Sequence, residues 1–332
     1  MNQKPKVTIC CITYNQEKYI RQTLDGFIAQ KTSFPFIVKI GDDCSTDNTK
    51  IIIEEYAKKY PDIIKPIYQK ENTNIYGNMC AVYSDIETDY VAICEGDDYW
   101  IDENKLQKQI NFLENNPEYT ICFHPVKVIF ENNEAPDYIY PKKKSNFTFD
   151  KFLYKNFIET NSVVYRWRYK NEKIENYHPE NIMPGDWFVH LLHAQTGKIG
   201  FINEVMSVYR RQSDGIWYDS FKDVQKLKLK YGIEMINFYK LVWKKLTNKS
   251  DEYLNKSLLP ALKDVLHTYY SFGNFDKCNE IKKENFDLVE KIIPLDNQDK
   301  LKNKYKKYKK LYFIFMNLTI FLSLILLWRI FG

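Results

Sequence analysis

A length of 332 residues suffices for one large or two modest domains, and 44% hydrophobic with 16% aromatic residues excludes an intrinsically disordered chain. The net charge of +5 is unevenly distributed, because residues 300–332 carry eight basic residues and no acidic one, which leaves residues 1–299 at −3. A mildly acidic body argues against broad nucleic-acid binding, so we expect no nucleic-acid partner.

The first part of the chain alternates apolar runs with amphipathic segments. The expected strands are residues 7–12, 36–40, 63–68 and 90–94. The expected helices between them are residues 16–30, with Asn15 as N-cap, then 48–60 and 77–86. This alternation predicts an open, mostly parallel α/β sheet with right-handed crossovers.

Polar clusters follow three of these strands. They are Thr13-Tyr14-Asn15, Asp42-Asp43 and Asp97-Asp98. The carboxyl ends of parallel strands meet at one edge of a sheet, where ligands bind in such folds, so we expect a common site. Adjacent carboxylates are costly to bury unless a cation neutralises them, and Mg²⁺ or Mn²⁺ prefers oxygen ligands. Taken alone, Gly96-Asp97-Asp98 is equally compatible with a solvated turn.

Two common nucleotide-binding signatures are missing from the sequence. No Gly-x-Gly-x-x-Gly follows a strand, and no Gly-x-x-x-x-Gly-Lys is present. A nucleotide at this sheet edge therefore has to be held by side chains and a metal ion.

The next segments are more varied. We expect a helix over 102–116, strands within 119–130, an exposed loop over 131–146, a short helix over 147–154 and a strand over 161–166. Gly185-Asp186-Trp187 opens a helix over 188–194, where an aspartate in the first turn is ordinary dipole complementation. His190 and His193 on that helix are predicted to be packing residues. Arg210 and Arg211 end a strand over 205–209 and suit either an anionic ligand or a solvated basic turn.

The C-terminal third is predicted to be helical, over residues 221–246, 253–272 and 275–292, without residues that carry chemistry. Residues 311–328 are uncharged and would form a helix of about 27 Å, slightly short of a hydrocarbon core of ~30 Å. The lysines before them favour an anionic cytoplasmic leaflet, so we expect membrane attachment, either spanning or interfacial. The alternative is a helix buried in an oligomer interface.

In this order and spacing, the motifs resemble the family 2 glycosyltransferases, which have the GT-A fold. The resemblance covers roughly residues 6–217. The stretches that carry it are Cys11–Asn15, Gly41–Thr49, Glu95–Trp100, Gly185–Trp187 and Tyr209–Arg211. The expected fold class is thus α/β of GT-A type, Rossmann-like with flanking helices. The expected organisation is a GT-A domain over 1–217, a helical subdomain over 218–295, a polybasic linker over 296–310 and an apolar, membrane-associated helix over 311–332.

The resemblance implies inverting transfer of a sugar from a nucleoside-diphosphate donor to an acceptor hydroxyl. It implies substrate-binding roles for Thr13, Tyr14, Asp42, Asp43, Asp97, Arg210 and Arg211. It also implies that Asp98 is the ligand of Mg²⁺ or Mn²⁺ and that Asp186 is the general base. A membrane tail on a cytosolic body suggests a lipid-linked or growing cell-envelope glycan as acceptor, and a location on the cytoplasmic side of the membrane.

One position departs from the family pattern. Gln212 occupies a position where family members often have a histidine, which puts metal or donor affinity in question. Two other hypotheses remain open. A sugar nucleotidyltransferase would need a glycine-rich basic loop after the first strand, and Thr13–Glu17 is not one. A non-catalytic membrane-tethered GT-A scaffold is supported only by Gln212, and Asp98 and Asp186 argue against it.

Overall fold

The computed structural model describes residues 4–131, 133–142, 146–212, 215, 218 and 223–292. The chain forms two compact units, residues 1–222 and 223–332. The expected polybasic linker and apolar helix, over 296–332, lie outside the described residues. Within the described ranges, no helix is both long enough and apolar enough to cross a membrane.

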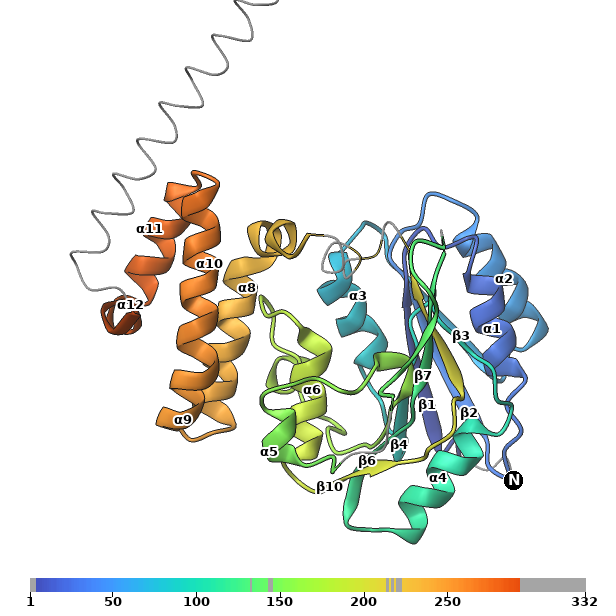
Figure 1. The fold of residues 1–332 in the computed structure, drawn as a ribbon. Helices are drawn as coiled ribbons and strands as arrows, with labels where there is room; N and C mark the ends of the chain where they lie inside the picture. Colours follow the sequence, from blue (N-terminus) through green and yellow to red (C-terminus); the bar gives the residue numbers. More distant parts are fainter. Residues whose placement is uncertain are drawn as a thin grey trace, which may run out of the picture. The chain divides into compact units, whose positions relative to one another are not determined.

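The first unit is built on a seven-stranded sheet with the order β10-β6-β9-β4-β1-β2-β3 (Figure 1). Its strands are β1 (Val7–Thr13), β2 (Phe36–Asp42), β3 (Ile64–Tyr68), β4 (Tyr90–Ile93), β6 (Tyr119–Phe123), β9 (Val164–Arg166) and β10 (Lys198–Phe201). Strand β1 pairs in parallel with β2 and β4, and β2 pairs in parallel with β3. Only β9 runs antiparallel to its neighbours, β4 and β6. The prediction of a mostly parallel α/β sheet is confirmed.

Helices cover both faces of this sheet (Figure 1). They are α1 (Ile20–Ile28), α2 (Thr49–Lys59), α3 (Asn74–Tyr83), α4 (Lys105–Asn115), α5 (Phe149–Phe152) and α6 (Gly185–Ala194). Apolar residues of α1, α2 and α4 pack with the sheet in one buried core that includes Leu24, Ile53 and Ile110. Helix α3 packs on β1 and β2 from the other face.

A second, four-stranded sheet has the order β5-β11-β7-β8. Its strands are β5 (Tyr99–Trp100), β7 (Val126–Phe130), β8 (Tyr138–Tyr140) and β11 (Ser207–Arg211). Strand β11 runs antiparallel to β5, with Val208 opposite Tyr99. This pairing brings a strand from the end of the unit beside residues that directly follow Asp97-Asp98.

The second unit consists of helices. They are α8 (Val224–Lys245), α9 (Asp251–Tyr253), a π-helical turn (Leu254–Leu258), α10 (Leu259–Ser271), α11 (Phe275–Glu284) and α12 (Phe286–Ile292). Helices α8 and α10 approach closely at Gly232, where a Cβ atom would lie 2.7 Å from Cγ1 of Val265. Glycine is therefore required there by packing. The helical prediction for this region is correct in type.

Several predicted boundaries were wrong for identifiable reasons. Asn15 is not an N-cap, because its φ of 52° is left-handed and its side chain accepts a hydrogen bond from the Thr46 amide (2.8 Å). Helix α1 begins only at Ile20. The helix expected over 275–292 is divided at Asn285, whose φ of −128° is not helical. Strands β5, β8 and β10 were not predicted, since short edge strands carry little periodicity.

Candidate active site

The polar strand ends converge as the sequence predicted. In the β1–β2 register, Thr13 lies opposite Asp42. The Gly96 amide continues the β1–β4 pairing by donating to the Ile12 carbonyl (3.0 Å). The three polar clusters therefore share the carboxyl edge of the central sheet, which is where α/β folds bind ligands.

The turn that carries Asp97 and Asp98 is held by the neighbouring elements. The Thr23 hydroxyl of α1 lies within hydrogen-bonding distance of the Gly96 carbonyl (2.9 Å) and the Asp98 carbonyl (2.6 Å). A Cβ atom at position 96 would lie 2.4 Å from Oε1 of Gln16 and 2.8 Å from Cβ of Thr13, so the turn requires glycine. These contacts fix the two carboxylates that follow.

Asp98 is a buried carboxylate with one unpartnered oxygen. Its Oδ1 accepts a hydrogen bond from the Arg210 amide (2.8 Å), whereas Oδ2 has no partner among the described residues. Burial raises the pKa of Asp98 well above its usual value, and the charges of Asp97 and Glu95 raise it further. A buried oxygen without a donor, in a field of like charges, fits a divalent cation. No group of three or more His, Cys, Asp or Glu side chains in the described ranges could hold a metal by itself. A metal at Asp98 would need ligands from a bound substrate or water.

Asp97 is more fully engaged by the protein. Its Oδ2 accepts from the Gln212 amide (2.6 Å), and its carbonyl accepts from Nε of Arg210 (2.9 Å). Burial raises the pKa of Asp97, while the Gln212 hydrogen bond and the Arg210 charge oppose that change. Gln212, the position that departs from the family pattern, thus holds an Asp97 oxygen with a neutral donor.

The two arginines at the end of β11 have different surroundings. Nη2 of Arg210 donates to Gln22 (2.8 Å), and its guanidinium lies over the Tyr19 and Tyr99 rings at 4.7 Å and 5.1 Å. Together with its bonds to Asp97 and Asp98, these contacts fasten Arg210 to the turn. The Arg211 guanidinium lies 5.9 Å from the Tyr209 ring, and its charge opposes the rise in the pKa of Glu159 that burial and Asp186 cause.

Asp186 lies in the first turn of α6, where its Oδ2 accepts from the Thr160 hydroxyl (3.1 Å). Its charge acts on two glutamates that sequence reasoning did not select. Burial first, and then neighbouring carboxylates including Asp186, raise the pKa of Glu95 to about 8 and that of Glu159 to about 7. Asp186, Glu95 and Glu159 therefore belong to one acidic cluster with Asp97 and Asp98.

Glu95 and Glu159 differ in how they could have been found. Glu95 precedes Gly96-Asp97-Asp98 directly, so its place at the strand end was a usable signal. Glu159 precedes a single 3₁₀ turn (Thr160–Ser162) and has no motif around it. Only the fold brings it to the cluster.

The remaining predicted residues lie at the ends of β1 and β2. Oδ1 of Asp43 accepts from both the amide (2.8 Å) and the hydroxyl (2.7 Å) of Thr73, which precedes α3. Asp42 is buried, its Oδ1 has no partner among the described residues, and burial raises its pKa. The Thr13 hydroxyl donates to Gln16 (2.7 Å), whereas Tyr14 is 45% exposed at the rim.

The histidines of α6 do not join the site. His190 and His193 are fully buried, His193 stacks on the Tyr165 ring (4.3 Å), and the Tyr165 hydroxyl bonds to His190 Nδ1. Burial lowers the pKa of His190 to about 4 and that of His193 to about 3, so both are neutral at pH 7. The prediction that they are packing residues is confirmed.

Part of the carboxyl-edge site lies in a region that matches a protein-family model. Residues 8–162 match the family model described as Glycosyl transferase family 2. That match covers just under half of the chain. An uncharacterized protein of Mycobacterium tuberculosis is 46% identical over 222 residues, which are 66% of this chain and 63% of that protein. The chain thus spans less than two thirds of the length of that relative.

Solved structures share a GT-A-like fold with this chain. Staphylococcus aureus TarS, residues 1–349, in complex with UDP-GlcNAc has a TM-score of 0.52 at 16% identity, covering 79% of this chain and 81% of that one. The mannosyltransferase PcManGT of Pyrobaculum calidifontis, in complex with GDP-Man and Mn²⁺, has a TM-score of 0.52 at 14% identity, covering 80% and 75%. At such identities the similarity shows the GT-A-like fold alone.

The residues matched to the family 2 model contain only part of the site. Thr13, Asp43, Asp98 and Glu159 lie inside residues 8–162, whereas Asp186 and the strand-end arginines lie beyond them. The site therefore needs the later elements α6 and β11 in addition to the matched region.

Proposed function

We propose that this chain is an inverting glycosyltransferase that moves a sugar from a nucleoside-diphosphate donor to an acceptor hydroxyl, with Mg²⁺ or Mn²⁺. The observation that carries the proposal is the unpartnered Oδ2 of Asp98, buried at the carboxyl edge of a family 2 domain. The complexes of TarS with UDP-GlcNAc and of PcManGT with GDP-Man and Mn²⁺ support this class of donor and metal.

The geometry supports a division of roles along the sheet edge. Thr13, Tyr14, Asp42 and Asp43, at the ends of β1 and β2, would bind the nucleoside. Asp97, held by Gln212, would face the ribose.

Asp98 would hold the metal, which neutralises charge on the leaving diphosphate when it is bound. Arg210 and Arg211, at the end of β11, are the candidates for the diphosphate. Arg210 would also keep Asp97 and Asp98 in place, through its bonds to the turn.

Asp186 would act as the general base. An alcohol is a poor nucleophile at pH 7, so a carboxylate has to take its proton as its oxygen bonds to the anomeric carbon. The bond from that carbon to the diphosphate oxygen breaks on the opposite face, its electron pair leaves with the diphosphate, and the configuration inverts. The Thr160 hydroxyl, 3.1 Å from Oδ2 of Asp186, would orient the carboxylate.

The acceptor and the location are inferred from the C-terminal sequence. Residues 311–328 are uncharged and follow a lysine-rich stretch, which supports attachment to the cytoplasmic face of a membrane. A catalytic body held there suits a lipid-linked or growing envelope glycan.

The test is hydrolysis of a panel of nucleotide sugars by the full chain, with Mn²⁺, with Mg²⁺ and with a chelator. We expect one donor to respond, and to respond only with metal. Asp98→Ala should lose this activity, whereas Asp89→Asn is the control, because Asp89 is exposed and pairs with Lys170 (2.6 Å). Absence of hydrolysis and of binding for every donor would refute the proposal.

A further inference from the structure

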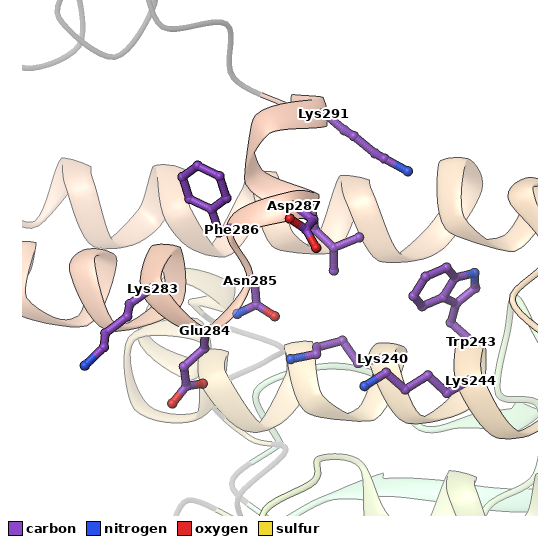
Figure 2. A pocket seen from close by; sticks show the side chains of 10 residues that line it. Lys240, Trp243, Lys244, Lys283, Glu284, Asn285, Phe286, Asp287 and Lys291 are labelled. Atoms are coloured by element: carbon purple, nitrogen blue, oxygen red, sulfur yellow. The ribbon is translucent and has the colours of Figure 1, made fainter.

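A cavity of about 520 Å³ lies within the helical second unit, and none of the site residues described above lines it. It is bordered by α8, α12 and the end of α11. Its lining includes Lys240, Trp243 and Lys244 of α8, Lys283 of α11, and Phe286 and Lys291 of α12. Figure 2 shows Lys240, Trp243 and Lys244 along α8, with Lys291 reaching from α12 on the opposite side.

The four lysines of this cavity have no acidic side chain within ion-pair distance among the described residues. None of them makes an ion pair or hydrogen bond with a described residue, whereas Lys228 and Lys256 of the same unit pair with Asp264 (2.5 Å) and Glu252 (2.8 Å). The lining also contains two acids, Glu284 and Asp287, so it carries a net charge of +2. Lys240 is half-buried, and burial together with the charge of Lys244 lowers its pKa, while the charge of Glu284 opposes that change. An anion would relieve this repulsion.

The cavity also exposes aromatic surface. Phe286 is 62% exposed at its edge, and Trp243 is partly buried, with its indole N–H donating to the Ser250 carbonyl (3.1 Å). Cations beside an exposed phenylalanine and a tryptophan are typical of surfaces that contact lipid headgroups while aromatic rings enter the interface.

The sequence that follows the cavity residues also favours contact with an anionic lipid surface. Lys291 is followed, from residue 300 on, by the lysine-rich stretch and then by the uncharged run over 311–328. Between Lys291 and residue 332 the acidic residues are Asp296 and Asp299, and residues 300–332 contain none.

We propose that the cavity between α8 and α12 docks the phosphate headgroup of an anionic lipid and holds the helical unit against the membrane surface. This inference extends the membrane location proposed above and does not depend on the sugar-transfer chemistry. Lys240, Lys244 and Lys291 would contact the phosphate, and Trp243 and Phe286 would lie at the level of the headgroups.

The first test compares binding of the full chain to vesicles of phosphatidylcholine with and without phosphatidylglycerol. The double variant Lys240→Gln/Lys244→Gln should bind the anionic vesicles roughly tenfold more weakly than the matched control Lys245→Gln/Lys263→Gln. The control also removes two positive charges from the helical unit. Lys245 directly follows Lys244 on α8, and neither Lys245 nor Lys263 lines the cavity. If both double variants bound the anionic vesicles equally weakly, the proposal would be overturned. Binding would then depend only on the long-range attraction between the positive charge of the unit and the anionic membrane.

The second test locates the contact. Tryptophan fluorescence is measured on the full chain with vesicles that contain brominated phosphatidylglycerol, which quenches nearby tryptophans. Trp328 lies in the uncharged run and is replaced by phenylalanine in every variant, so that it does not contribute to the quenching. The fluorescence should fall when the vesicles are added, and the further substitution Trp243→Phe should remove most of that fall. Unchanged quenching without Trp243 would refute the site.

Donor hydrolysis is measured on the same preparations. Inactive protein that still binds vesicles through Trp243 would refute the proposed enzyme and leave the lipid site standing.

Discussion

Replacing Asp98 by asparagine should abolish sugar transfer and, at the same time, stabilise the fold. Asparagine keeps the oxygen that accepts from the Arg210 amide (2.8 Å). It removes a charge that is fully buried and repelled by Asp97 and Glu95, whose proximity helps to raise the pKa of Asp98. Its amide hydrogens would face those carboxylates in place of the unpartnered Oδ2.

The magnitude follows from the cost of burying the charge. Fully buried carboxyl groups reach pKa values several units above normal, and each unit is worth about 1.4 kcal/mol of difference between the protonation states. Part of this is lost because the new asparagine side-chain amide also has to be hydrogen-bonded in the interior. We therefore expect the free energy of unfolding to rise by ~2 kcal/mol at pH 8. For a unit of this size, that gain raises Tm by roughly 4–8 °C.

The pH dependence gives the sign of the effect. In the unfolded chain Asp98 has its ordinary pKa of 3.8, whereas in the fold that pKa is raised. Between these two values the folded state binds more protons, so this group makes stability fall as pH rises. The advantage of Asp98→Asn should therefore be small near pH 4 and grow toward pH 8.

The assay is thermal unfolding of the wild type and Asp98→Asn across this pH range, with Asp89→Asn as control. The control removes an exposed carboxylate that pairs with Lys170 (2.6 Å) and should change Tm little. Addition of Mn²⁺ with a nucleoside diphosphate should then raise the Tm of the wild type and of Asp89→Asn, and leave that of Asp98→Asn unchanged. Retained transfer in Asp98→Asn, or a stability advantage that does not depend on pH, would contradict the role assigned to the buried charge.

Three further outcomes are expected. Asp186→Asn should reduce the rate of sugar transfer by about 10²–10⁴-fold, because a general base contributes roughly that much. A group that only accepts the acceptor's proton does not bind the donor, so the donor affinity measured by titration calorimetry should stay within about twofold. A large loss of donor affinity would contradict the role of general base. Lys105 is fully buried, with its amine 4.0 Å from the Trp100 ring centroid, and burial lowers its pKa from 10.5 to about 7. Between these two pKa values the unfolded chain binds more protons than the folded one, so Lys105 should make the free energy of unfolding rise between about pH 7 and 10. Lys105→Met should remove that rise in a Tm-against-pH series, and an unaltered slope would show that the amine stays charged. Deleting residues 300–332 should move the protein from the membrane fraction to the soluble fraction, and unchanged fractionation would rule out the tail as the anchor.

The sequence by itself determined the type of sheet and the edge at which the site lies. Apolar strands alternating with helices require parallel pairing, and parallel strands bring their carboxyl ends to one edge. The polar residues after β1, β2 and β4 could therefore be assigned to a common site without coordinates. Their separation along the chain did not matter, because strand polarity alone brings them together.

The tertiary structure decided which side chains in that site are engaged and which are available. The bond from the Arg210 amide to Asp98 joins residues 112 positions apart, and it depends on β11 lying beside β5. Local sequence cannot encode such a pairing, since nothing in Arg210-Arg211 distinguishes the residue that fastens the turn from its neighbour. Glu159 likewise joins the acidic cluster only because the fold brings a 3₁₀ turn next to the first turn of α6. Burial and charge at that position, rather than any motif, give it a pKa of about 7.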